Sequence, residues 1–233
     1  MAQRPVFLSA VANGLVGEAT VEFEWFPGFA VIQKQRSIAS LHAAAIETLG
    51  VGRLLEISTK SPDPLGVRLS AFNLSVEVDG EPNRVLLEAA FQGSKVFATQ
   101  GPFTHLYAVR DGRAVKRFMN ELPDDQLTGF RFVGHDWPLS PQTAFYDWLY
   151  LNSLRELAGQ DDQVEEALLG ADGFTDIEFN PNKSINCQAR SSALYVALTK
   201  NGTLTDALTD PDAFIEVLTS HGYGIEPSQG QLL

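Results

Sequence analysis

The stretch LEAAFQGSKVF (87–97) contains a carboxylate and an amine at helical spacing. On a helix that turns by about 100° per residue, Glu88, Gln92 and Lys95 fall within one narrow sector, opposite small and apolar positions. A carboxylate beside an amine can carry out acid–base or covalent catalysis. A charged stripe on a helix is nonetheless usually a solvated face, so the spacing alone leaves both interpretations open.

A second segment, TKSPDPLGVRLSAFNL (59–74), holds polar side chains that could join this pair. It carries Thr59 and Lys60 on a predicted loop. The loop leads into a predicted extended segment with Ser70, Phe72 and Asn73. By itself this is an ordinary loop and strand, although loops often carry functional residues.

A third segment, FTDIEFNPNKSINCQARS (174–191), combines an acid with a phosphate-binding pattern. Asp176 lies in a predicted extended segment. Lys183, Ser184 and Asn186 lie at the predicted start of a helix, with Arg190 one turn further on. Free backbone N–H groups and the helix dipole attract a phosphate to such a position. The alternative is that Ser184 only caps the helix.

Composition narrows the function classes. With 29 acidic and 17 basic residues, the chain has a formal net charge of −12. This charge disfavours sequence-independent coating of DNA, but it is compatible with local binding of one modified nucleotide. The histidines are scattered and no metal-binding, P-loop or dinucleotide motif occurs, so we expect no metal and no cofactor. The single cysteine, Cys187, and the short apolar runs predict a soluble cytoplasmic protein without membrane contact.

The elements that must position these residues are mostly helical. Apolar periodicity predicts helices at 34–50, 87–97, 111–121, 141–157, 164–170, 185–202 and 211–222, and strands or extended segments at 20–26, 53–58, 68–78, 128–134 and 173–179. Short strands separated by several helices indicate an α+β fold, mainly helical around a small sheet. Aromatic residues at 137–150 are expected in the core, with Tyr146 a candidate stacking surface for a base.

Taken in order, STKSPDPLGVRLSAFNL, LEAAFQGSKVF and FTDIEFNPNKSINCQARSSALYVAL resemble the NADAR family, enzymes that cleave N-glycosidic bonds of ribosyl derivatives. The runs QKQ, SAFNL, FQGSKVF, TAFYDWLYLNSL and FTDIEFNPNKSINCQARS resemble one branch, the NADAR-type antitoxins associated with DarT-like toxins. Those toxins attach ADP-ribose from NAD to guanine in DNA. The chain departs from the family pattern at Ala89, where the family has histidine, and at Phe174-Thr175, where it has tryptophan-glycine.

The resemblance implies an N-glycosidase that removes ADP-ribose from guanine in DNA, as antitoxin to a DarT-like toxin. It assigns catalysis to Glu88, Lys60 and Asp176, with Lys60 as the attacking amine and Lys95 as its alternative. Lys183 and Arg190 would hold the pyrophosphate. The full set of implied substrate-binding residues is Ser58, Ser70, Phe72, Asn73, Gln92, Lys95, Lys183, Asn186 and Arg190.

The expected organisation is an N-terminal strand and helix extension (1–50) packed on a NADAR-like catalytic domain (51–222), followed by a tail (223–233). Two other functions stay open at this point. One keeps the chemistry but acts on a small ribosylamino metabolite. The other is a non-catalytic acidic inhibitor that sequesters a DNA-binding partner, which the net charge of −12 motivates.

Overall fold

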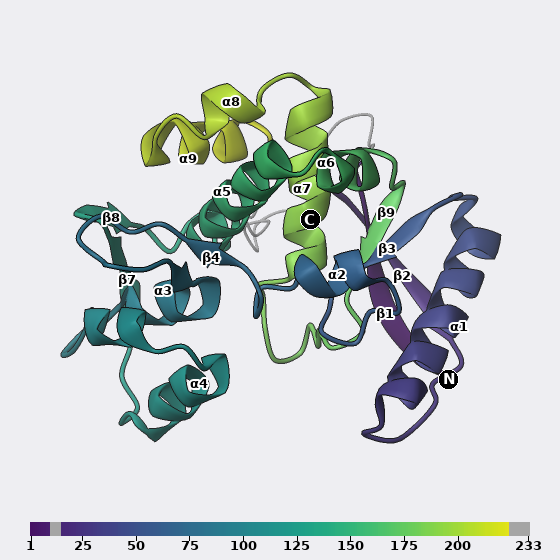
Figure 1. Ribbon diagram of the computed structural model, residues 1–233, viewed down its shortest axis with the longest axis horizontal. Coiled ribbons are helices and arrows are strands. Elements are labelled where there is room, and N and C mark those ends of the chain that lie inside the picture. The colour runs from purple at the N-terminus through teal and green to yellow at the C-terminus, as the bar shows by residue number, and fades with distance from the viewer. Residues whose placement is uncertain (10–14, 224–233) are drawn as a thin grey trace, which may run out of the picture.

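The computed structural model describes residues 1–9 and 15–223, and the tail predicted at 227–232 lies outside them. The largest sheet in this part of the chain has the strand order β2-β1-β9-β3 (Figure 1). Its strands are β1 (Ala2–Leu8), β2 (Gly17–Phe23), β9 (Gly173–Thr175) and β3 (Leu54–Glu56). β1 pairs antiparallel with β2 and β9, whereas β3 and β9 are parallel. The two N-terminal strands thus share a sheet with two strands from the predicted catalytic domain.

The four-stranded sheet is covered by different helices on its two faces. On one face, α1 (Val31–Leu49) packs Ile38, Leu41 and Ala45 against Val21 and Phe23 of β2. α1 ends at Gly50, whose φ of 68° is the left-handed conformation that glycine adopts without strain. The other face packs on the main core, because successive side chains of a strand point to opposite sides. The helix predicted at 34–50 is therefore confirmed.

Two buried helices, α5 (Ala144–Gln160) and α7 (Gln188–Lys200), form the centre of the main core. α6 (Asp162–Leu169), α8 (Leu204–Ala207) and α9 (Pro211–Ser220) pack around them. Tyr150 of α5 is fully buried and donates its hydroxyl hydrogen bond to the Leu69 carbonyl, 2.8 Å away. This bond ties the core to the chain that leads into the site. None of the helices in the described ranges has both the length and the apolar composition that a membrane span requires.

A second lobe lies on the side of the core opposite α1 (Figure 1). It contains β4 (Ser75–Val76), β5 (Val85–Leu86), α3 (Leu87–Gly93), β6 (Lys95–Phe97), the 3₁₀ helix η1 (Thr104–Ala108), α4 (Gly112–Glu121), β7 (Leu127–Phe132) and β8 (His135–Trp137). β6, β7 and β8 form an antiparallel sheet, and β4 pairs with β5. Helices and small sheets together confirm the α+β class.

The prediction of one helix over 87–97 was wrong in its second half. α3 ends at Gly93, where a Cβ would lie 2.7 Å from the Tyr107 ring, and Lys95 begins a strand paired with Phe130 of β7. The partner strand is more than thirty residues away, so local periodicity carries no sign of it. Lys95 consequently leaves the helix face that carries Glu88.

The segment 59–78 also differs from its prediction as a loop followed by a strand. It contains a short helix, α2 (Pro64–Arg68), capped by Asp63, whose carboxylate accepts from the backbone N–H of Leu65 at 2.9 Å. Gly66 allows the helix to approach β3 closely, since a Cβ there would overlap the backbone oxygen of Glu56. Turns follow at 69–73, and only the two residues of β4 are extended.

Candidate functional site

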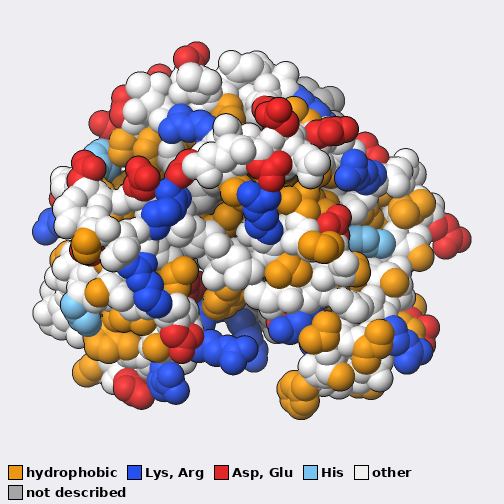
Figure 2. All heavy atoms as spheres, viewed as in Figure 1, with side chains coloured by type: hydrophobic (Ala, Val, Ile, Leu, Met, Phe, Trp, Pro, Cys, Tyr) orange, Lys and Arg blue, Asp and Glu red, His pale blue; other side chains and the backbone are white. Residues whose placement is uncertain are grey.

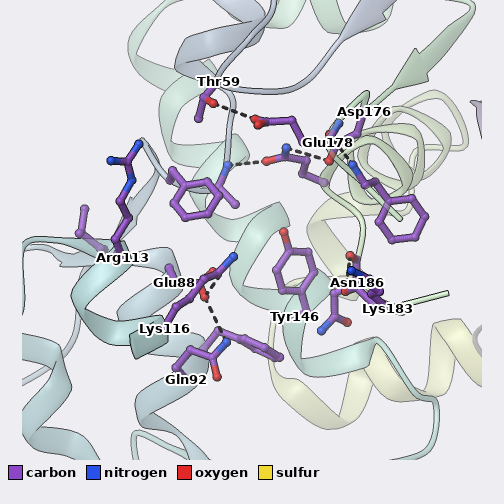
Figure 3. Close-up of a pocket in the computed structure, with 18 of the residues that line it drawn as sticks. Thr59, Glu88, Gln92, Arg113, Lys116, Tyr146, Asp176, Glu178, Lys183 and Asn186 are labelled. Carbon is purple, nitrogen blue, oxygen red and sulfur yellow. Dashed lines mark hydrogen bonds and ion pairs between the residues drawn. The ribbon is translucent and has the colours of Figure 1, made fainter. Parts of the chain in front are cut away.

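A cavity of about 780 Å³ lies between the second lobe and the carboxyl ends of β3 and β9 (Figure 3). Its lining comes from five parts of the chain, namely the loop after β3, the turn before β4, α3, the start of α4, and the 176–188 segment, together with Tyr146 of α5. The lining residues are Thr59, Lys60, Ala71, Phe72, Leu86, Glu88, Phe91, Gln92, Arg110, Asp111, Gly112, Arg113, Lys116, Tyr146, Asp176, Glu178, Phe179, Asn180, Lys183, Ser184, Asn186 and Gln188.

The wall made by β3 and β9 brings Lys60 and Asp176 to the same edge of the sheet. The strands are parallel, with Glu56 opposite Thr175, so the residues that follow both strands emerge together. Thr59 of one loop donates its hydroxyl to Glu178 of the other at 2.8 Å. This cross-link fixes the two loops against each other.

Asp176 is held by hydrogen bonds to both carboxylate oxygens. The backbone N–H groups of Glu178 and Phe179 donate to Oδ1 at 2.9 and 3.1 Å, and Gln188 Nε2 donates to Oδ2 at 2.9 Å. Gln188 accepts in turn from the backbone N–H of Ala71 at 2.7 Å. Asp176 therefore has one fixed orientation, and α7 is tied to the turn that carries Phe72.

A second acid, Glu56, lies behind Asp176. Burial, followed by the charge of Glu56, raises the pKa of Asp176 above the ordinary carboxyl range. Glu56 accepts from the Thr175 hydroxyl at 2.6 Å and from the Ile177 N–H at 2.8 Å, yet burial still raises its pKa. Burial lowers the pKa of His42 to about 4, and His42 Nε2 forms a hydrogen bond with Thr175 Oγ1 at 2.8 Å. At neutral pH, simultaneous ionisation of Asp176 and Glu56 is therefore unfavourable.

The opposite wall holds Glu88 among basic and amide groups. Glu88 is only 7% exposed, and its Oε1 accepts from Gln92 Nε2 at 3.1 Å. Lys116 Nζ of α4 lies 3.9 Å from the same oxygen and 4.5 Å from the centre of the Phe72 ring. Both acids accept a hydrogen bond from a glutamine amide, but in the described part of the chain only Glu88 of the two also has a lysine amine within ion-pair distance.

Tyr146 lies between the two walls (Figure 3). Its ring packs edge-on against Phe91, with centroids 5.4 Å apart. Burial raises the pKa of Tyr146 well above its usual range, and the charges of Tyr150, Glu88 and Asp176 raise it further. The phenol therefore stays protonated as a hydrogen-bond donor near both acids.

The pocket is locally basic in an acidic chain. Five basic and four acidic residues occur in its lining, against 17 and 29 in the whole sequence. The basic residues are Lys60, Arg110, Arg113, Lys116 and Lys183. Figure 2 shows Lys and Arg side chains gathered at the hollow between the two lobes. Such a cavity suits an anionic ligand.

The structure brings together seven of the residues selected from the sequence. These are Lys60, Phe72, Glu88, Gln92, Asp176, Lys183 and Asn186, all of which line the cavity. Ser58, Ser70, Asn73, Lys95 and Arg190 do not line it. Ser58 and Ser70 are fully buried, with Ser70 Oγ donating to Gln188 Oε1 at 3.2 Å. Asn73 donates to the Val67 carbonyl at 2.7 Å.

Two expected binding positions need correction. α7 begins at Gln188, so Lys183 and Ser184 lie on the preceding loop, and Ser184 donates to the Asn186 carbonyl instead of capping the helix. Arg190 lies away from the cavity, with its guanidinium 4.5 Å from the centre of the Tyr223 ring. Lys183 and Ser184 therefore do not form the predicted phosphate-binding site at the start of a helix.

Lys95 also has a different setting from the one its spacing predicts. Its amine lies 5.3 Å from the centre of the Phe91 ring, on β6. Burial lowers the pKa of Lys95, and the charge of Glu88 opposes that shift. Lys95 is thus close enough to Glu88 to influence it, but of Lys60 and Lys95 only Lys60 lines the cavity.

Sequence reasoning missed the contribution of α4 and of two polar partners. Arg113 and Lys116 are three residues apart on α4, which places both on the side that faces Glu88. Glu178 and Gln188 orient the Asp176 wall. The helix at 111–121 was predicted correctly, but the fold alone determines which of its faces meets α3.

Two carboxyl groups in unlike environments, with amines beside them in a basic cavity, are features typical of an active site. The model of the DarT1-associated NADAR antitoxin family matches residues 2–224, so the chain belongs to this family. It is an antitoxin that accompanies a DarT toxin. The match includes β1, β2 and α1. A search of curated proteins found no match.

Proposed function

We propose that this antitoxin is an N-glycosidase that removes ADP-ribose from guanine bases in DNA. The observation that carries the proposal is the meeting of Glu88, Lys60 and Asp176 in one basic cavity, although they come from three distant segments. The family supplies the DarT toxin as partner, and the cavity's charge suits the pyrophosphate of ADP-ribose.

Asp176 is the general acid in this mechanism. The bond to be broken joins the anomeric carbon of the ribose to a guanine nitrogen, and its electron pair leaves with the base. Because burial and Glu56 raise the pKa of Asp176, its carboxyl group retains a proton to give to that nitrogen. Tyr146, protonated and nearby, is positioned to donate a hydrogen bond to the same ligand.

Glu88 stabilises the positive charge that develops on the anomeric carbon and ring oxygen as the base departs. Its carboxylate is fixed by Gln92 and Lys116, so it need not reorient during the reaction. In glycosidases a carboxylate in this role can also accept a proton from the attacking group.

Lys60 is the nucleophile. The lone pair of its amine forms a bond to the anomeric carbon, and the nitrogen then gives a proton to Glu88, which leaves a lysyl glycosylamine in equilibrium with its ring-opened imine. Water then adds its hydroxyl to the same carbon and its proton to the Lys60 nitrogen, releasing ADP-ribose. The proton on Glu88 returns to Asp176 through solvent, so both acids regain their starting forms.

The basic residues of the second lobe and of the 176–188 loop would bind the pyrophosphate. Arg113 and Lys183 lie on different sides of the cavity (Figure 3), and Phe72 offers a partly exposed ring for a base. Charge-assisted contacts of this kind are worth roughly 1.5–3 kcal/mol each when well enclosed. Lys183 is exposed, so its contribution belongs below that range.

Purified protein should be given an ADP-ribosylated guanine oligonucleotide and, separately, a small ribosylamine. We expect release of free ADP-ribose from the oligonucleotide and at most slow turnover of the ribosylamine. Efficient turnover of the small substrate alone would assign the pocket to a metabolite. Stoichiometric protection against the toxin that survives Glu88→Gln and weakens with salt would instead indicate a non-catalytic inhibitor.

A further inference from the structure

The loop between β2 and α1 is a fixed structure outside the cavity. The backbone N–H of Glu24 donates to Ser40 Oγ at 3.1 Å, and that of Phe26 donates to Ser37 Oγ at 3.0 Å. Both serines belong to α1. Gly28 has a φ of 130°, which only glycine adopts readily, so the chain can turn back toward the helix. The side chains of this loop are therefore presented in a defined arrangement.

Several apolar side chains of this region face solvent. Phe29 is 101% exposed, Ile32 is 61% exposed and Val31 is 50% exposed. They contribute nothing to the core that α1 shares with β2. Neighbouring large apolar groups left in water on a small protein commonly mark a binding surface.

Three basic side chains of this region lie over aromatic rings. Lys34 Nζ is 4.5 Å and Arg4 Cζ is 5.4 Å from the centre of the Trp25 ring. Arg36 Cζ is 4.2 Å from the Phe26 ring. Arg4 Nη1 donates to the Gln3 carbonyl at 2.9 Å and Arg36 Nη1 donates to Gln33 Oε1 at 3.4 Å. Stacking on a ring orients each guanidinium, and its remaining N–H groups can bind an anion.

These basic groups are not neutralised by nearby acids. In the described ranges no salt bridge involves Arg4, Lys34 or Arg36, and the sequence has no acidic residue from 25 to 46. Glu22 alternates with Val21 and so points away from α1. Arg4 pairs directly with Val21 and shares the α1 side of the sheet.

Arg4, Trp25, Phe26, Phe29, Lys34 and Arg36 together form what we call the aromatic rim. In Figure 1 the start of α1 lies across from α4, and Figure 2 shows the hollow opening between the two lobes. Exposed rings beside unneutralised cations are the features by which proteins bind single-stranded nucleic acid. We take this opening as the path by which a strand whose modified guanine occupies the cavity leaves the pocket.

We propose that the aromatic rim binds single-stranded DNA flanking the ADP-ribosylated guanine, an inference that rests on the proposed function. Phosphates contact Lys34, Arg36 and Arg4, and a base stacks on Phe29. The rim thereby makes a modified DNA strand a better substrate than an isolated modified nucleoside.

The test compares three variants with the wild type in oligonucleotide affinity and in kcat/KM. Lys34→Glu/Arg36→Glu reverses the charge of the rim, Phe29→Ser removes a fully exposed ring, and Lys200→Glu is the matched control. Lys200 ends α7, whose other end, Gln188, lines the cavity. Fluorescence anisotropy gives the affinity for an unmodified single-stranded oligonucleotide. Kinetics give kcat/KM for an ADP-ribosylated oligonucleotide and for ADP-ribosylated guanosine.

We expect the double variant to weaken oligonucleotide binding about ten-fold or more and to reduce the slope of log K against log salt by about 1.4, from two phosphate contacts at about 0.7 each. Phe29→Ser should weaken binding about five-fold or more, on the scale of one base–aromatic stack. kcat/KM should fall in parallel on the oligonucleotide and stay unchanged on the nucleoside. Lys200→Glu should match the wild type in every assay.

Variants that bind and turn over the oligonucleotide like the wild type would overturn the proposal. If those variants also lose binding to purified DarT toxin, the rim is a protein interface and not a DNA surface. If the proposed N-glycosidase function is wrong, the wild type releases no ADP-ribose from either substrate. Anisotropy still shows in that case whether the aromatic rim binds DNA, so the two failures can be distinguished.

Discussion

The two walls of the pocket hold their carboxyl groups in opposite ways. Asp176 is enclosed by backbone N–H groups and Gln188, with a second acid, Glu56, behind it. Glu88 has an amide from Gln92 and a lysine amine from Lys116 as its partners. One wall belongs to a sheet buried on both faces, the other to a short helix beside an exposed basic helix.

This contrast assigns different roles to two chemically similar side chains. Environments that separate the pKa values of two acids mark one as a proton donor and the other as a charged stabiliser. Asp176 faces a second acid, and its raised pKa favours the protonated form, whereas Glu88 has the Lys116 amine 3.9 Å away. Substitutions that remove one feature of either wall should therefore have different effects.

The largest effect is expected for Lys60→Arg. A guanidinium stays protonated and cannot attack, so turnover should fall by about 10³-fold or more, as when a nucleophile is removed. Borohydride added during wild-type turnover should trap ADP-ribose on the tryptic peptide that contains Lys60, and the variant should give no adduct. An adduct on Lys95 or Lys116 would transfer the role to that amine. Turnover without any adduct would favour direct attack by water.

Glu88→Gln keeps the shape of the side chain and removes its charge. We expect turnover to fall by about 10²–10³-fold, the scale of losing one electrostatic stabiliser, with the Tm within a few degrees of the wild type. Steady-state kinetics and thermal denaturation measure the two effects. A variant that retains turnover within a few-fold would remove Glu88 from the mechanism.

Glu56→Gln tests whether the buried acid keeps Asp176 protonated. Glu56 raises the pKa of Asp176, so its removal should lower that pKa and move the alkaline limb of kcat/KM to lower pH. A raised pKa stabilises the fold at low pH, and this contribution is lost as pH rises through the folded-state pKa. Thermal denaturation should therefore show that the variant loses less stability as the pH rises from the ordinary carboxyl pKa of 3.8 to the folded-state pKa of about 8. An unchanged pH–rate profile would contradict the role of Glu56.

Lys183→Ala and Arg190→Ala form a matched pair with the smallest effects. Lys183 lines the cavity, so its loss should weaken binding of free ADP-ribose by up to about five-fold by calorimetry, the range of one exposed ionic contact. Arg190 packs on Tyr223 and its charge favours ionised Asp147. Its loss should lower the Tm by about 2–8 °C, from roughly 1–2 kcal/mol in a chain of this size, and leave ADP-ribose affinity unchanged. The reverse pattern would restore Arg190 to the binding site.

Much of the fold could be predicted from local pattern, because a helix that buries one side repeats its apolar residues every three to four positions. This was sufficient for α1, α4, α5, α7 and α9, with boundaries shifted by a few residues. The strand β6 was missed because its pairing with β7 depends on a distant segment. The short helix α2 was missed although Asp63 and Pro64 are typical of a helix start.

The site could be predicted only in part for the same physical reason. Lys60 and Asp176 meet because β3 and β9 pair in parallel across 119 residues, as the bond from Thr175 to Glu56 records. The order of the motifs indicated that these segments act together. Which side of α4 meets α3, and whether Arg190 points into the cavity or toward Tyr223, depends on packing that no local spacing encodes.

Mass analysis of both products from one ADP-ribosylated guanine oligonucleotide tests most directly that this pocket breaks the bond between ribose and guanine. We expect the wild-type protein to return the oligonucleotide to the mass of the unmodified strand and to release one equivalent of intact ADP-ribose. An oligonucleotide that keeps a ribose phosphate, loses its guanine, or remains fully modified would contradict it.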